Sequence, residues 1–175
     1  MSSFVAHGLV GAVIGRRIAP TASGIAAGAV FALLPDIEYA FLWLRGEAFG
    51  EAFAVRWTHS LAFVVLAAGT MLWRRDLCGI ALLAGVSHLA MDALVGVHPN
   101  PLLWPFTERG FTSPVGLLPS AGHLDPTNFY FWRNLLIEMG ILLPVLAAMR
   151  MRGAGRYGAL SIAAAFLGWS LSLDR

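Results

Sequence analysis

Gly85-Val86-Ser87-His88-Leu89-Ala90-Met91-Asp92 is the stretch that decides the fold, because it sets two polar side chains within an apolar helix. The surrounding residues 77–97 are apolar and long enough to cross a bilayer, which takes about 20 residues. His88 and Asp92 are four residues apart, so on a helix they share one face and can bind one ion. Ionisable side chains inside a membrane span are by default functional. The alternative is a buried polar pair that only ties two helices together.

The composition is that of a membrane protein. Hydrophobic residues make up 58% of the 175 residues and charged residues 13%, and the mean hydropathy is +0.70. Soluble domains are about 45–50% apolar and about 25% charged. We therefore expect the lipid bilayer as a partner and one membrane-embedded domain over residues 1–175.

Charge and cysteine content exclude other classes of protein and site. A net charge of +2, spread over short loops, provides no basic patch for nucleic acid. The single cysteine, Cys78, excludes an internal disulfide and a cysteine-based zinc site. The first residues lack a basic segment and a small-residue cleavage site, so we expect no removed signal peptide.

Six apolar segments predict an all-α, polytopic membrane bundle with about five to six membrane helices. The second segment is interrupted by Pro35, which removes a backbone donor and kinks a helix. Residues 98–128 form a long polar connection, of the kind that often binds a substrate. We expect Trp104, Phe106 and Phe111 to anchor this loop at the headgroup level, where aromatic residues are enriched. The apolar segments cover residues 4–14, 22–44, 58–73, 77–97, 129–149 and 157–171.

Arginines in the short connections set the expected orientation. These short connections alternate with two longer loops, residues 45–56 and 98–128, in which acidic residues dilute the positive charge. The positive-inside rule places the basic connections in the cytoplasm and the two longer loops outside. The basic connections contain Arg16 and Arg17, Arg74 and Arg75, and Arg150, Arg152 and Arg156.

The ionisable side chains of the spans gather near the same, extracytoplasmic end. Asp92 lies only about 8 Å of helix before Val97, so the expected site is shallow in the inner membrane. Histidine and carboxylate ligands without thiolates suit zinc, with manganese or iron as alternatives. The candidates exceed the three or four ligands of one catalytic ion, so two ions sharing a carboxylate are also possible. The candidate ligands are His7, Asp36, His59, His88, Asp92 and His98.

Five short motifs, taken in order, resemble the YdjM-type family of predicted inner-membrane metal-dependent hydrolases. The resemblance covers residues 1–106, and the rest matches only as apolar spans. Two departures from the family pattern are Glu38, where an aspartate is usual, and 54–56, where His-Arg-Gly is frequent. The motifs are Ala6-His7-Gly8, Leu-Leu-Pro-Asp-Ile-Glu at 33–38, Thr-His-Ser at 58–60, Ser-His-x-x-x-Asp at 87–92 and Pro-Leu-Leu-Trp-Pro at 101–105.

A looser likeness is to secreted zinc-dependent phospholipases C and the related single-strand zinc nucleases. The order of the six candidate ligands is similar to the order in those all-helical enzymes. Their next element would be His-x-x-x-Glu, whereas this chain has Asn134 and Glu138 at that spacing. The likeness implies phosphoester hydrolysis, by analogy alone.

The residues and the resemblances together predict a membrane-bound hydrolase in which a metal activates water against a phosphoester or ester of a lipid or amphiphile. Asp36 is the expected bridging ligand, and His7 or His98 would complete a second ion. We expect Glu38 to act as general base or to orient a ligating histidine. Arg56 and Arg109 would neutralise a phosphate or serve only as interfacial anchors.

Two other functions stay open from the sequence. A divalent-metal transporter also places histidine and aspartate within spans, although such sites lie near the bilayer midplane at broken helices. A structural membrane protein could keep a metal only as a staple, which a closed site of four ligands would indicate.

Overall fold

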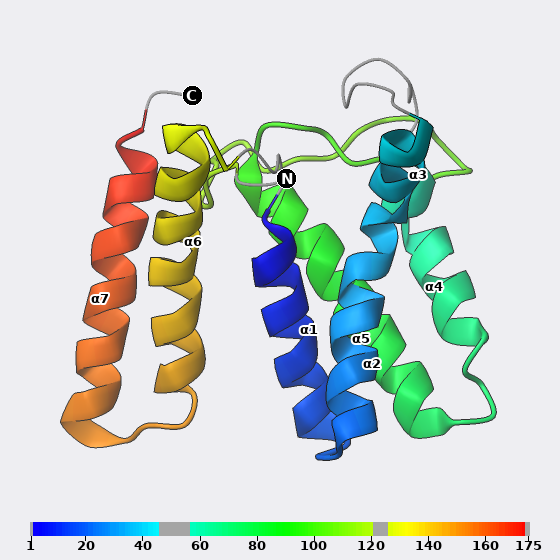
Figure 1. The fold of residues 1–175 in the computed structure, drawn as a ribbon, viewed down its shortest axis with the longest axis horizontal. Helices are drawn as coiled ribbons and strands as arrows, with labels where there is room; N and C mark the ends of the chain where they lie inside the picture. Colours follow the sequence, from blue (N-terminus) through cyan, green and yellow to red (C-terminus); the bar gives the residue numbers. More distant parts are fainter. Residues whose placement is uncertain (1, 46–56, 121–125, 174–175) are drawn as a thin grey trace.

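The computed structural model describes residues 2–45, 57–120 and 126–173, which form an all-helical bundle (Figure 1). Within these ranges the only strand-like pairing is an isolated bridge between Asn100 and Phe111. The all-α prediction is therefore confirmed for the described residues. The helices are α1 (Phe4–Ile18), α2 (Ala22–Leu33), the 3₁₀ turn η1 (Leu34–Asp36), α3 (Ile37–Arg45), the 3₁₀ turn η2 (Trp57–His59), α4 (Leu61–Gly69), α5 (Arg75–Val95), α6 (Phe129–Ala148) and α7 (Gly153–Leu171).

The expected number of membrane helices is not confirmed. In the described part of the chain, only α5 and α6 are both long and apolar enough to span a membrane. The 15 residues of α1 extend about 22 Å, short of a hydrocarbon core of about 30 Å. The second apolar segment breaks where Pro35 turns α2 into η1, and the third ends after the 9 residues of α4. The apolar segments of the sequence therefore run across positions at which the helices end, which is why they overestimate the number of spans.

Glycines allow α1 and α2 to touch backbone to backbone. A Cβ atom on Gly11 would overlap the carbonyl oxygen of Gly28, and one on Gly15 would overlap the carbonyl oxygen of Gly24. Small residues permit such close approach between helices in lipid. The contact places the start of α1, with His7, beside the end of α2.

Helix α5 is the centre of the larger group of helices, since α1, α2 and α4 all pack against it. Its Gly85 lies under Val64 of α4, which a Cβ atom would displace. Helices α6 and α7 form a hairpin beside this group (Figure 1). A buried apolar cluster of Ala6, Met91, Val95 and Leu118 joins α1, α5 and the long loop, and Met139 of α6 packs on it.

The connections sort onto two ends of the bundle. The turns α1–α2, α4–α5 and α6–α7 lie at one end in Figure 1, and the arginines of the short connections lie in these turns or in the adjoining helix ends. The long loop and the described N-terminal residues lie at the other end. Hydrogen bonds from Ser113 N–H to the Ala93 carbonyl and from Leu117 N–H to the Leu94 carbonyl hold the loop on the end of α5.

Candidate metal centre

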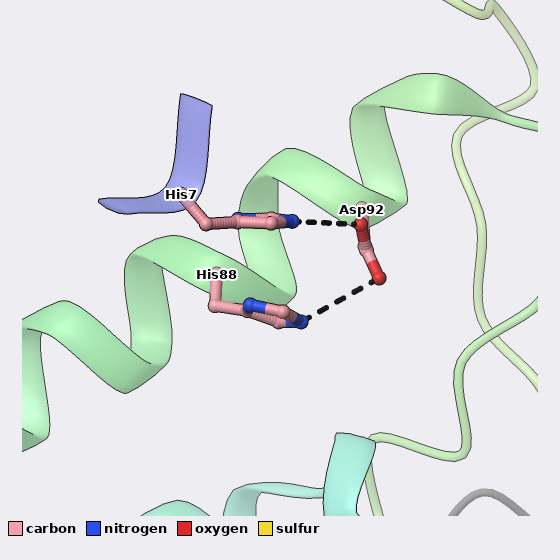
Figure 2. Close-up of side chains that lie close together, drawn as sticks. All are labelled: His7, His88 and Asp92. Atoms are coloured by element: carbon pink, nitrogen blue, oxygen red, sulfur yellow. Dashed lines mark ion pairs between the residues drawn. The ribbon is translucent and has the colours of Figure 1, made fainter. Parts of the chain in front are cut away.

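Helix α5 positions the first two side chains of the site. His88 and Asp92 lie one turn apart on its buried face, and His88 Nε2 is 3.7 Å from Asp92 Oδ2. His7 reaches the same carboxylate from α1, with its Nε2 3.3 Å from Asp92 Oδ1. The rings of His7 and His88 stack with centroids 3.8 Å apart and planes 21° apart. Figure 2 shows both rings directed at Asp92.

The two 3₁₀ turns supply the other side of the site. Pro35 ends α2 and leaves Asp36 at the end of η1, while His59 closes η2 just before α4. His59 Nε2 lies 3.3 Å from Asp36 Oδ1 and 3.6 Å from Asp92 Oδ2. His88 Nε2 lies 3.7 Å from Asp36 Oδ1. Side chains from α1, η1, η2 and α5 therefore converge, although 85 positions separate the first from the last.

These separations are close to those of atoms that share one ion. Two ligands about 2.0–2.1 Å from a tetrahedral zinc lie about 3.3–3.4 Å apart. The four distances that join the imidazoles of His59 and His88 to the carboxylates of Asp36 and Asp92 are 3.3, 3.6, 3.7 and 3.7 Å. Two overlapping groups, which share His88, each bring three possible ligand atoms within 4.8 Å of one another: His7, His88 and Asp92, and Asp36, His59 and His88.

Hydrogen-bond partners fix the orientation of the two central imidazoles. His88 Nδ1 donates to the carbonyl of Ala32 at 2.7 Å, which leaves the lone pair on Nε2 facing the carboxylates. His59 Nδ1 lies 3.2 Å from Glu38 Oε1 and 3.2 Å from Thr58 Oγ1. An Nδ1–H directed at Glu38 gives the carboxylate–histidine arrangement that accompanies metal-binding histidines.

The site is closed to solvent, and it contains polar atoms that protein groups do not satisfy. His7, His59 and His88 are 0% exposed, and no ligand candidate in the two groups exceeds 5%. Among the described residues, His88 Nε2 and Asp36 Oδ2 are buried without a hydrogen-bond partner. Buried polar atoms are nearly always paired, and a cation between them would satisfy both. The donor set therefore fits a divalent metal.

Two sequence candidates lie elsewhere. His98 is exposed and belongs to neither ligand group, because α5 ends at Val95 and Gly96, with φ of 74°, turns the chain away. Arg109 is exposed on the long loop. Arg56 lies outside the described residues.

Glu138, whose role the sequence leaves open, belongs to the surroundings of the site. Its side chain, on α6, is 0% exposed. It accepts hydrogen bonds from the backbone N–H of Ser3 and from the hydroxyl of Ser2. In the sequence, the only indication of a role for Glu138 was that it is a lone acidic residue within an apolar span. Its partners, about 135 positions earlier, could not be identified from spacing.

The chain matches a family model described as YdjM inner membrane protein over residues 1–174. The match extends well beyond the motifs of residues 1–106 and places the chain among inner membrane proteins. Its description names no hydrolase and no phospholipase C. No curated protein and no solved structure matches the chain.

Proposed function

The chain belongs to the YdjM inner membrane protein family, and we propose that it is a membrane-bound, metal-dependent hydrolase. The observation that carries the proposal is the convergence of two imidazoles and two carboxylates at separations of 3.3–3.7 Å. Zinc suits this mixture of nitrogen and oxygen ligands best, with manganese or iron as alternatives. The proposed ligands are Asp36, His59, His88 and Asp92, with His7 available to a second ion.

Each residue has a distinct part in this proposal. A bound divalent metal would supply the Lewis acidity that promotes attack by water on an ester or phosphoester. Asp36 Oδ1 lies close to the Nε2 atoms of both His59 and His88. Its other oxygen, Oδ2, accepts no hydrogen bond from any described residue. Glu38 Oε1 lies 3.2 Å from His59 Nδ1, a placement that suits orientation of that imidazole better than general-base catalysis. The burial of the cluster excludes bulk water and strengthens every electrostatic interaction within it.

A groove beside Asp36 supports an amphiphilic substrate. Its walls are apolar, its volume is about 340 Å³, and Asp36 is its one ionisable lining residue among those described. An acyl or prenyl chain could lie along such walls while its ester approaches the carboxylate. The other lining residues are Phe4, Val30, Leu33, Leu34 and Ile37.

Orientation toward the extracytoplasmic face is part of the proposal. The basic turns occupy one end of the bundle, and the positive-inside rule assigns that end to the cytoplasm. The ligands come from the start of α1, the end of α2 and the second half of α5, nearer the opposite end. Phe106, 90% exposed on the long loop, suits an anchor at the headgroup level there.

A second candidate function is a purely structural metal. Its support is the burial of every candidate ligand, because a closed metal site keeps no open position for a substrate. In that case the metal would hold η1, η2 and α5 together and no substrate would reach it.

One set of measurements separates these functions. Purified protein should retain one or two metal ions per chain by elemental analysis and should cleave an ester or phosphoester lipid in mixed micelles, with loss of turnover on chelation. Asp36→Asn should lower turnover far more than it lowers the unfolding temperature. Bound metal without turnover over a broad lipid panel, combined with an unfolding temperature that collapses on chelation, would support the structural role. Metal flux in proteoliposomes without turnover would support a transporter.

A further inference from the structure

Glu138 is the one acidic side chain that α6 buries, and it does not belong to either ligand group. Both of its carboxylate oxygens accept the backbone N–H of Ser3, at 3.1 and 3.2 Å. Its Oε1 also accepts a close hydrogen bond from the Ser2 hydroxyl. With both oxygens engaged in this way, Glu138 is committed to the Ser2-Ser3 segment and is not available as a metal ligand.

The same short segment contacts the metal centre. The backbone N–H of Ser2 donates to Asp92 Oδ1 at 2.9 Å. Ser3 begins α1 as its N-cap, since its hydroxyl accepts the N–H of Ala6 at 3.1 Å. Both serines are almost completely buried, at 1% and 2% exposure. Ser2 and Ser3 thus form a continuous hydrogen-bonded bridge from α6 to Asp92 on α5.

The bridge fixes the orientation of the Asp92 carboxylate, so that one oxygen faces Ser2 and His7 and the other faces the remaining candidate ligands. Oδ1 receives the Ser2 N–H and lies 3.3 Å from His7 Nε2. Oδ2 is then directed at His59 and His88, at 3.6 and 3.7 Å. A rotation of the carboxylate plane away from this orientation would break the Ser2 hydrogen bond inside a buried site, which is costly.

We propose that Glu138 is a positioning residue of the metal centre, which fixes the Asp92 carboxylate through Ser2 and Ser3. The inference rests on the proposed metal centre, but it does not depend on hydrolysis. It gives α6, which otherwise packs mainly on α7, a direct part in the site. Partners that orient metal ligands typically change metal affinity by about 10–100-fold when removed.

The test compares Glu138→Ala with Asn134→Ala, a matched loss of a polar anchor one turn earlier on α6. Asn134 donates to the Ser120 carbonyl at 2.7 Å and holds the loop, and its hydrogen bonds within the described residues go to Ser120 and Arg133. Zinc affinity is measured by chelator competition, and the visible spectrum of the Co²⁺-substituted protein reports ligand geometry. We expect Glu138→Ala to weaken zinc binding about 10–100-fold and to alter the Co²⁺ spectrum. Asn134→Ala should leave both unchanged at a similar unfolding temperature.

Two further variants keep the test decisive if Glu138→Ala does not fold. Glu138→Gln retains the shape and one acceptor oxygen and should show a smaller loss of affinity in the same direction. Ser2→Ala removes one of the hydrogen bonds to Glu138 but keeps the N–H to Asp92, so it should weaken zinc binding less than Glu138→Ala does. Equal zinc affinity and spectra for unaltered, Glu138→Ala and Glu138→Gln proteins would overturn the inference, as would equal losses in Asn134→Ala. Absence of zinc binding by the unaltered chain would instead overturn the metal centre itself.

Discussion

His88 is the residue at which the two candidate ligand groups meet, so its loss should affect any ion held there. We expect His88→Ala to lower metal affinity by at least about 100-fold, more than loss of an orienting partner, because a ligand atom disappears. His98→Ala is the matched control, since that imidazole is exposed and outside both groups. Metal content by elemental analysis after dialysis checks both variants. Retention of metal in His88→Ala, or equal loss in His98→Ala, would refute the ligand assignment.

Glu38 gives a second prediction at the scale of single residues. Its Oε1 lies 3.2 Å from His59 Nδ1, a position from which a carboxylate would orient the imidazole and make its other nitrogen a better ligand. We expect Glu38→Gln, which keeps the shape without the charge, to weaken zinc binding about 10–100-fold without abolishing it. Chelator competition measures the change. Unaltered zinc affinity, together with a large loss of turnover, would show that Glu38 is a general base and not an orienting residue.

Most of the candidate ligands that the structure brings together follow from local sequence patterns, whereas His7 followed from the order of the motifs and the expected topology. His88 and Asp92 follow from a helical repeat, and Asp36 and His59 follow from motifs placed next to helix starts and breaks. His98 has the right chemistry, but the turn at Gly96 directs it away from the others. Glu138 could not be connected to the site, because the hydrogen bonds that do so come from serines at the other end of the chain.

At the scale of helices, the contact between α1 and α2 decides whether His7 reaches the site. We expect Gly28→Ala to destabilise the bundle by about 1–3 kcal/mol and to release metal, because the new Cβ overlaps the Gly11 carbonyl oxygen. Gly158→Ala is the control on α7, where a Cβ meets nothing within 4 Å. That control should be neutral or stabilise by up to about 1 kcal/mol through helix propensity. Thermal unfolding and metal content in detergent measure both, and equal stability of the two variants would contradict the packing.

The positions of the helices were easier to predict from the sequence than the residues at which they begin and end. Apolar runs identified α5 and α6 well, because helix and hydrophobic segment coincide there. For residues 22–44 the run conceals the change from α2 through η1 to α3 at Pro35. For residues 58–73 it hides a 3₁₀ turn before α4 and further turns after Gly69. Hydropathy reports burial in apolar surroundings, whereas helix ends depend on local backbone hydrogen bonds.

At the scale of the whole molecule, the alternation of short basic and long polar connections predicted how the chain folds back on itself. The structure places the three basic turns at one end and the long loop at the other (Figure 1). The sequence could not predict how completely the bundle encloses the site. The bundle surrounds the candidate ligands so closely that each is almost fully buried, and a groove at Asp36 approaches them.

Orientation in the membrane is the prediction that belongs to this scale. Arg152, at the α6–α7 turn, and Glu108, on the long loop, are both exposed and lie toward opposite ends of the bundle. In a Cys78→Ala background, a cysteine replacing Glu108 should react with an impermeant thiol reagent applied to spheroplasts. A cysteine replacing Arg152 should react only after permeabilisation, because the positive-inside rule holds that turn in the cytoplasm. The reverse pattern would place the metal centre near the cytoplasmic face, and a substrate would then have to come from the inner leaflet. Labelling of both sites without permeabilisation would show that α6 does not cross the membrane, since one crossing separates them.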